Sequence, residues 1–389
     1  MSHFPGGLRV LSRGLSETYR SVVVSPTAVA TSPSRSGIVV PPSIPAPAVG
    51  PALNPARIIE TGAGFWPSKV LLTAVELDVF TTLGARALTG VELQRALGLH
   101  SRGVYDFLDA LVALGFLDRV GDGPAGRYRN TPDTAAFLDK NQPSYIGGML
   151  EMLNARLFGY WNDLGAALKT GEPQNEVKHD GRPLFEQLYS EPARLEQFMS
   201  AMRGISGPNF QALAEKFDFT KYRTVCDVGG ATGQLCTAVA ERHPHLACTS
   251  FDLPVIEPIA KRWIAKSSSA ARVTTAAGDF LKDPLPRADV ITMGMILHDW
   301  NLEKKKHLVR LAYEALPPGG AFIAVENLID DARRENAFGL LMSLNMLIEF
   351  GDAFDFTGAD FWSWCRDAGF SRYEVVHLNG PCSAAIAYK

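Results

Sequence analysis

Apolar residues recur at helical spacing in the part of the chain that follows residue 55. The segment Lys69–Leu83 carries them on one face, which predicts a first helix. Thr89, with a glutamate three residues later, has the pattern of a capping box and predicts the start of a second helix. Ser101 is expected to cap a third helix. Two short strands, 116–120 and 127–130, should follow, so the region has the order of helices and hairpin that is typical of a winged helix.

Residues 145–215 are expected to be helical and carry many large apolar side chains. Most of these should belong to the core. Some could line a pocket for a flat aromatic ligand, because methionine and aromatic side chains form adaptable apolar walls. Together with two methionines further along the chain, the candidates for such a pocket are Phe158, Trp161, Met202, Met295 and Met346.

Short apolar runs alternate with helical segments from residue 224 onward, which predicts an α/β fold with a doubly wound, mostly parallel sheet. A helix is expected over 302–316, and its lysine run Lys304–Lys306 is interpreted as a solvated face. Polar and acidic residues follow several strands, where ligands bind in open α/β sheets. The expected strands are 224–228, 246–251, 272–276, 289–295 and 321–325, followed by a terminal hairpin, 373–378 and 384–388.

The first 55 residues are rich in proline, serine, alanine and valine and are predicted to be a disordered tail. Their arginines, set against the single acid Glu17, would also suit an organellar transit peptide, although a tail without structure is the preferred interpretation. The predicted domains are therefore this tail, a helical winged-helix-like dimerisation domain at 56–215 and a nucleoside-binding catalytic domain at 216–389.

Composition and charge limit the function further. Hydrophobic residues make up 46% and charged residues 20%, which fits a globular protein, and the net charge of −3 lacks the basic excess of a nucleic-acid binder. The third helix offers Arg102 against Asp106 and Asp109, so a DNA-binding regulator is the least favoured alternative. Five cysteines without a CxxC pair indicate reduced thiols in a cytoplasmic protein, and we expect no metal, nucleic-acid or membrane partner.

A glycine turn at 229–233 follows the first strand of the sheet. It does not match the GxGxxG pattern of dinucleotide sites, because Ala231 and Gln234 stand at glycine positions. Asp252 follows the second strand about 20 residues later, where a carboxylate can bind ribose hydroxyls. Asp279 follows the third strand and could accept a hydrogen bond from an adenine amino group. No basic residues that could bind phosphates are evident beside these acidic residues. A cationic nucleoside without phosphates, such as S-adenosylmethionine (SAM), therefore fits the pattern.

Six motifs occur in order along the chain, and together they resemble a known family. They are Asp227–Gly233, Phe251–Pro254, Gly278–Phe280, His298–Trp300, Glu314–Gly320 and Glu326. In this order they resemble the metal-independent, SAM-dependent O-methyltransferases of the caffeic-acid and acetylserotonin type. Within that family they are most similar to the bacterial natural-product branch. The resemblance covers roughly residues 56–389. It implies a Rossmann-like methyltransferase sheet behind a winged-helix dimerisation domain, and hence a homodimer.

The resemblance also implies roles for single residues. His298 would be the general base, Glu326 its first supporting acid and Asp355 its second, with Glu349 as a possible substitute for Asp355. Gly294 stands where the family has a lysine or a similar polar residue. The residues expected at the cofactor are Ser206, Gly229, Asp252, Leu253, Asp279, Phe280 and Trp300.

A histidine base restricts the acceptor. A phenol has a pKa of about 10 and histidine one of about 6.5, a gap worth about 5 kcal/mol, whereas a simple alcohol leaves a gap of more than about 12 kcal/mol. The sequence therefore predicts methylation of a phenolic or enolic hydroxyl on a small aromatic acceptor. Gly294 and the context of Asp355 leave one alternative open, a cofactor-binding relative that acts as a polyketide hydroxylase or decarboxylase instead.

Overall fold

A computed structural model describes residues 53–180 and 188–389 of the chain. The predicted tail therefore lies outside the described residues up to residue 52. Arg57–Lys389 forms one compact unit. In the described part of the chain, no helix has both the length and the apolar character needed to cross a bilayer.

The first part of this unit contains short helices and a three-stranded sheet in the order β1-β3-β2. The predicted capping box is confirmed, since the Thr89 hydroxyl accepts the Glu92 amide and the Glu92 carboxylate accepts the Thr89 amide at 2.7 Å. The predicted hairpin is also confirmed, as β2 pairs with β3. The elements are α1 (Ala56–Ala63), α2 (Phe65–Glu76), α3 (Val79–Leu83), β1 (Leu88–Thr89), α4 (Gly90–Leu97), α5 (Val104–Ala113), β2 (Leu117–Val120), β3 (Arg127–Asn130) and α6 (Pro132–Phe137).

Two helix predictions in this region were wrong. The segment Lys69–Leu83 is not one helix, because Asp78 adopts a left-handed conformation with φ 56° and separates α2 from α3. Aspartate tolerates this conformation better than most residues. Ser101 does not cap the third helix, which begins at Val104 after Gly103 and has no side-chain cap.

The charges of α5 are paired on the protein itself. Arg102 forms an ion pair with Asp106, and Asp109 accepts hydrogen bonds from Arg119 and from the Tyr128 hydroxyl, both at 2.7 Å. A helix that reads a DNA groove must present free cations and amides to phosphates and bases. These contacts instead fix α5 to the hairpin.

A run of helices links this region to the large sheet. The chain passes through a single π-helical turn, η2, which joins α7 to α8. The elements are α7 (Gly147–Met152), η2 (Leu153–Leu157), α8 (Phe158–Tyr160), η3 (Trp161–Asp163), α9 (Leu164–Thr170), α10 (Val177–Asp180) and α12 (Pro192–Lys216).

The large sheet has seven strands in the order β6-β5-β4-β7-β8-β10-β9. Strands β4 to β8 are parallel, whereas β10 runs antiparallel to β8 and forms the predicted terminal hairpin with β9. The doubly wound sheet is thus confirmed. Its strands are β4 (Thr224–Val228), β5 (Ala247–Asp252), β6 (Val273–Ala277), β7 (Val290–Gly294), β8 (Ala321–Glu326), β9 (Arg372–Asn379) and β10 (Cys382–Tyr388).

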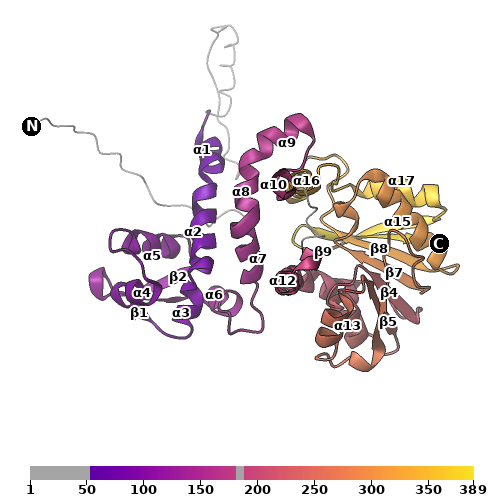
Figure 1. Cartoon of the computed structure of the whole chain (residues 1–389), viewed down its shortest axis with the longest axis horizontal. Coiled ribbons are helices and arrows are strands. Elements are labelled where there is room, and N and C mark those ends of the chain that lie inside the picture. The colour runs from indigo at the N-terminus through magenta and orange to yellow at the C-terminus, as the bar shows by residue number, and fades with distance from the viewer. Residues whose placement is uncertain (1–52, 181–187) are drawn as a thin grey trace, which may run out of the picture. The chain divides into compact units, whose positions relative to one another are not determined.

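Helices cover both faces of this sheet, and the strands carry apolar residues on both faces. Val225 belongs to the core cluster under α12, α13 and α14, while its neighbour Cys226 belongs to the cluster under α15 and α17. Figure 1 shows α13 below the strands and α15 and α17 above them. The helices are α13 (Gln234–Arg242), α14 (Glu257–Ile264), α15 (Leu302–Ala315), α16 (Ala337–Phe350) and α17 (Gly358–Ala368).

Close packing explains why glycine ends strand β7. A Cβ added at Gly294 would lie 2.8 Å from Cε1 of Phe210, whose ring from α12 fills this space. The family that the motifs resemble has a polar side chain at this position. Here the ring of Phe210 occupies the space that such a side chain would need.

We expect Gly294→Ala to destabilise the protein by about 1–3 kcal/mol, since the ring and the new methyl group overlap. Phe210→Leu should recover part of this loss in the double variant, although it costs stability alone. Urea unfolding of the four proteins measures the coupling. Strictly additive effects would contradict the proposed overlap.

Candidate active site

The parallel strands β4 to β8 end at one edge of the sheet, and the glycine turn lies at the centre of that edge. Gly229 has φ +71° and donates its amide to the Phe251 carbonyl at 2.8 Å. A Cβ at Gly229 would lie 2.4 Å from Cδ1 of Ile296 and 3.7 Å from Phe280. The turn therefore closely approaches the segment after β7 and needs glycine at this position.

Asp252, at the end of β5, is bound to the same turn. Its Oδ2 accepts the amide of Ala231 at 2.8 Å, and its Oδ1 accepts the amide of Leu253 at 2.7 Å. Burial raises the pKa of Asp252, and these two amides act in the opposite direction. The bonds fix the orientation of a buried carboxylate beside the turn, as a ribose-binding acid requires.

Phe280 and Trp300 bring two aromatic rings to the next strand ends. Their centroids are 6.0 Å apart and their planes lie at 81°. The indole Nε1 of Trp300 is buried and has no hydrogen-bond partner among the described residues. Asp279 pairs with Lys282 at 2.8 Å, and although burial acts to raise its pKa, this bond contributes to a net lowering.

Helix α12 contributes the remaining predicted cofactor residue. Ser206 is buried, and the adjacent Gly207 approaches Nε2 of Gln234, the first residue of α13. Ser206 therefore lies beside the end of the glycine turn. A glycine cradle, a fixed carboxylate and an indole donor without a partner fit a nucleoside cofactor.

His298 lies in the short turn η5 (Leu297–Asp299) directly after β7 and is 6% exposed. Its Nδ1 is 3.5 Å from Oδ1 of Asp355 and 3.9 Å from Oε2 of Glu326. Its Nε2 is 3.3 Å from Oδ1 of Asp299. Three carboxylates thus surround one imidazole.

Glu326, the last residue of β8, has two separate contacts. Its Oε1 accepts the amides of Leu297 at 2.9 Å and His298 at 3.4 Å, while its Oε2 faces the imidazole. One carboxylate therefore holds the backbone of the η5 turn and also faces the ring of His298.

Asp355 and Glu349 were the two candidates for the second acid, and the structure separates them. Asp355 lies beside Nδ1 of His298, and both of its carboxylate oxygens are buried without a hydrogen-bond partner in the described chain. Glu349 accepts hydrogen bonds from Arg156 at 3.0 and 3.2 Å and from Asn175 at 3.2 Å. Glu349 thus belongs to a different network, which joins α16 to η2.

The acids control the protonation of His298. Burial alone would lower its pKa, but Asp299, Glu326 and Asp355 outweigh burial and raise the pKa to about 10. Burial in turn raises the pKa values of Glu326 and Asp299. The three carboxylates thus favour the protonated form of the imidazole.

The same cluster has a geometry that a cation could use. His298, Glu326 and Asp355 each offer one ligand atom, and these atoms lie within 4.8 Å of one another. The amides bound to Oε1 of Glu326 and the resemblance to metal-independent enzymes favour a hydrogen-bonded base over a metal centre. Removal of metal ions tests this choice.

The predicted pocket residues lie on several elements. Trp161 donates its indole N–H to Asn345 of α16 at 2.9 Å, and Met346 is buried next to Asn345 in the chain. Met295 has φ 56° and directly precedes the turn of His298. Met202 is half-buried on α12. Phe158 lies against α2 instead, with Nζ of Lys69 4.8 Å from its ring centre.

Sequence reasoning missed three residues near the cluster. Asp299 is part of the motif but had no assigned role, although it faces Nε2 of His298. Tyr189 is near the cofactor edge, since Asp252, Asp279 and Asp299 all act, after burial, to raise its pKa.

The expectation of a solvated lysine run was wrong for Lys305, which is fully buried, whereas its two neighbours are exposed. The sequence did carry a signal for this burial, because Lys305 lies at helical spacing from Leu308 and Val309, which are buried on the same face of α15.

A glycine turn, a fixed acid and a buried histidine lie along one sheet edge, an arrangement that is typical of enzymes that bind a nucleoside cofactor. Comparisons with known proteins give the family. An O-methyltransferase domain model matches residues 161–371, and an O-methyltransferase dimerisation domain model matches residues 59–140.

Two curated relatives and one solved structure illustrate the similarity. The chain is 40% identical to the tetracenomycin polyketide synthesis 8-O-methyl transferase TcmO of Streptomyces glaucescens, over 86% of this chain and 97% of that protein. It is 33% identical to the 3-hydroxy-5-methyl-1-naphthoate 3-O-methyltransferase of Streptomyces sahachiroi, over 84% and 92%. Human N-acetylserotonin methyltransferase in complex with SAM superposes with a TM-score of 0.79 at 28% identity, over 88% of this chain and 99% of that one.

The chain therefore belongs to the SAM-dependent O-methyltransferases, as its motifs predicted. The α/β fold class is confirmed with it. The similarity supports methyl transfer and not the hydroxylase, decarboxylase or DNA-binding alternatives.

We expect Gly229→Ala to weaken binding of S-adenosylhomocysteine at least tenfold, because the new methyl group displaces Ile296 from the cofactor edge. Isothermal titration calorimetry measures the affinity. Gly98→Ala is the matched control, since Gly98 has φ +65° and no atom within 4 Å of the added Cβ. Equal affinities for the two variants would contradict a role for this turn in the cofactor site.

Proposed function

We propose that the protein transfers a methyl group from SAM to a phenolic or enolic hydroxyl of a small, natural-product-like aromatic acceptor, with His298 as the general base. The observation that carries this proposal is the burial of His298 among three carboxylates, two residues before Trp300. The names of both curated relatives support the acceptor class, since one refers to a polyketide and the other to a hydroxynaphthoate.

In the proposed reaction the acceptor hydroxyl lies at Nε2 of His298, where Asp299 is now the neighbour. Bound SAM supplies a methyl group on a positively charged sulfur. The acceptor oxygen forms the new O–C bond as the C–S bond breaks, and the hydroxyl proton passes to Nε2. Asp355 and Glu326 stabilise the resulting imidazolium from the Nδ1 side. S-adenosylhomocysteine and the methyl ether are the products.

The raised pKa of His298 suits this acceptor. With a pKa of about 10, the imidazole matches a phenol, so moving the proton between them is close to neutral in free energy. The carboxylates thereby close the gap of about 5 kcal/mol for the transfer step itself, while the same proton affinity makes the neutral imidazole, the form that accepts the proton, scarcer at neutral pH. A simple alcohol would still face a gap of about 8 kcal/mol.

We assign cofactor binding to the residues of the sheet edge. Asp252 and Leu253 would hold the ribose, Asp279 and Phe280 the adenine region, and Trp300 would pack on the adenine. Gly229 would let the backbone approach the cofactor, and Ser206 would lie near its methionine part. The bonds of Asp252 to the glycine turn support this assignment.

For the acceptor we propose a flat apolar pocket formed by Trp161, Met202, Met295 and Met346, and we assign Phe158 to the groove along α2. The indole bond from η3 to Asn345 supports a shared wall, because α16 also carries Met346. Such walls select shape and apolar surface more than a particular polar group.

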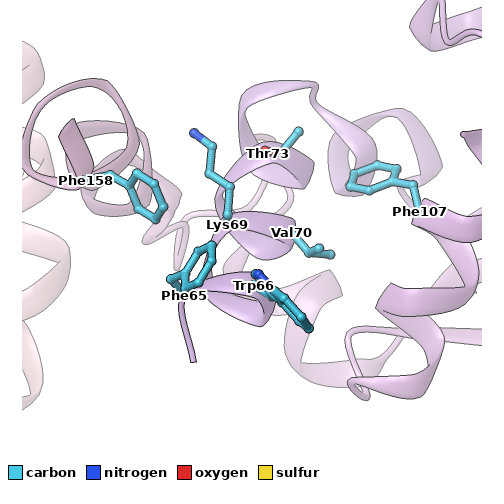
Figure 2. A pocket seen from close by; sticks show the side chains of 7 residues that line it. All are labelled: Phe65, Trp66, Lys69, Val70, Thr73, Phe107 and Phe158. Atoms are coloured by element: carbon cyan, nitrogen blue, oxygen red, sulfur yellow. The ribbon is translucent and has the colours of Figure 1, made fainter. Parts of the chain in front are cut away.

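We further propose that residues 56–215 mediate a homodimer, that residues 216–389 form the catalytic domain and that the protein is cytoplasmic. Five buried free cysteines support the last point. For the dimer, Figure 2 shows an open groove where Phe65 and Trp66 of α2 lie between Phe158 and Phe107. The groove has a volume of about 410 Å³, and Trp66 is 64% exposed. An apolar patch of this kind favours coverage by a second copy.

We expect His298→Gln to lower kcat by about 10²–10⁴-fold, because it removes the base, while the affinity for S-adenosylhomocysteine stays unchanged. Transfer of labelled methyl to a panel of phenols measures kcat. His377→Gln, which alters an exposed histidine of β9, is the control.

The same assay tests metal independence. Treatment with EDTA should leave the rate of the wild-type protein unchanged. Undiminished turnover in His298→Gln would show that His298 is not the base. If EDTA abolished activity and only added divalent ions restored it, the cluster would be a metal centre instead.

We expect Trp66→Asp to convert the dimer to a monomer, because a carboxylate in the groove cannot be buried against an apolar partner. Light scattering after size-exclusion chromatography measures the mass. Val91→Asp is the control, since Val91 is an exposed apolar residue that does not line the groove. A monomeric wild-type protein, or a Trp66→Asp dimer of unchanged stability, would contradict this interface.

A further inference from the structure

Lys305 is the fully buried lysine of α15, on the side of the helix that faces the sheet. Its ammonium donates a hydrogen bond to the carbonyl oxygen of Trp300. It also lies 3.7 Å from the ring centre of Phe354 and 5.9 Å from that of Phe356. A carbonyl and two aromatic faces thus hold a cation inside the protein.

Carboxylates from three neighbouring segments act on the charge of Lys305. Asp299 comes from η5, Glu326 from β8, and Asp352 and Asp355 from the segment between α16 and α17. Burial lowers the pKa of Lys305 to about 8 while these four acids act to raise it, so the ammonium remains charged at neutral pH.

Three of these acids are the ones that surround His298. One imidazolium cannot balance three buried carboxylates, and an uncompensated buried charge is strongly destabilising. Glu349, which also acts on Asp299, is already paired with Arg156. Lys305 is therefore a second buried cation beside these three carboxylates, and it offsets part of the charge that the imidazolium leaves unbalanced.

The contact with Trp300 adds a geometric link. Trp300 follows the η5 turn directly, so the bond from Lys305 to its carbonyl ties the end of this turn to α15. Glu326 holds the start of the turn through the amides of Leu297 and His298. The backbone around the imidazole is thus held at both ends.

We propose that Lys305 is a positioning residue for the methyl transfer proposed above: it anchors the turn of His298 through the Trp300 carbonyl and supplies the positive charge that keeps the facing carboxylates ionised. The proposal rests on His298 as the base. It predicts that the charge of Lys305, and not only its volume, controls the reaction.

The sign of the effect follows from electrostatics. Removal of a positive charge raises every macroscopic pKa of a coupled cluster, wherever the protons reside. Because the neutral imidazole is the base, activity rises with pH as the imidazolium loses its proton. Lys305 carries its charge at pH 7, so kcat/KM of Lys305→Met at this pH should be about tenfold lower than that of the wild-type protein. The two pH profiles should converge at higher pH, where Lys305 itself becomes neutral.

The control variants separate charge from packing. Lys305→Arg retains the charge and should keep kcat/KM at pH 7 close to that of the wild-type protein. Lys306→Met removes the same charge from the next position of α15, where the side chain is 47% exposed and 3.4 Å from Asp367, and should leave kcat/KM unchanged. If Lys305→Met fails to fold, Lys305→Gln takes its place. An unchanged kcat/KM at pH 7 in the neutral variant, or an equal loss in Lys305→Arg, would overturn the proposal.

A second measurement keeps this inference separate from the proposed function. Hydrogen exchange of the Trp300 amide, which donates to the Leu297 carbonyl at 3.2 Å, reports the anchoring of this turn without any methyl transfer. This amide should exchange about tenfold faster in Lys305→Met than in the wild-type protein or in Lys305→Arg. Failure to methylate any acceptor would reject the proposed function alone, whereas unchanged exchange in Lys305→Met would reject the role of Lys305.

Discussion

The burial of one imidazole among three carboxylates is the constraint on which the rest of the site depends. Charges removed from water need partners, and the contacts around His298 provide them. Glu326 binds two backbone amides with one oxygen and faces the imidazole with the other. Asp355 lacks any other hydrogen-bond partner in the described chain, so its charge is directed at Nδ1. These carboxylates thus raise the pKa of His298 above that of an exposed histidine.

The parallel sheet makes this concentration of charge possible. Strands β4 to β8 end at one edge, so residues from five separate segments meet there without long loops. Asp252 is hydrogen-bonded to the glycine turn at this edge, and the turn after β7 brings His298 to the same edge. A positively charged sulfur held at this edge would itself lower the proton affinity of His298 when the acceptor reacts.

Much of the fold could be predicted from sequence because its signals are local. The strands of the sheet, the capping box at Thr89 and the terminal hairpin each follow from residues near in the chain. The break at Asp78 could not, because tertiary packing decides it, and the burial of Lys305 was indicated only by its helical spacing from Leu308 and Val309. The same holds for Glu349, whose partner Arg156 is 193 residues away and leaves no local pattern. The motif directed attention to His298, but only the structure distinguished Asp355 from Glu349 as the acid beside it.

The central claim is that an acceptor hydroxyl gives its proton to His298 while its oxygen attacks the methyl carbon. A crystal structure with S-adenosylhomocysteine and a phenolic acceptor tests this most directly. The account predicts the acceptor oxygen within hydrogen-bond distance of Nε2 of His298 and on the line from the sulfur toward the incoming methyl position. An acceptor bound elsewhere, with His298 still enclosed by Asp299, Glu326 and Asp355, would contradict it.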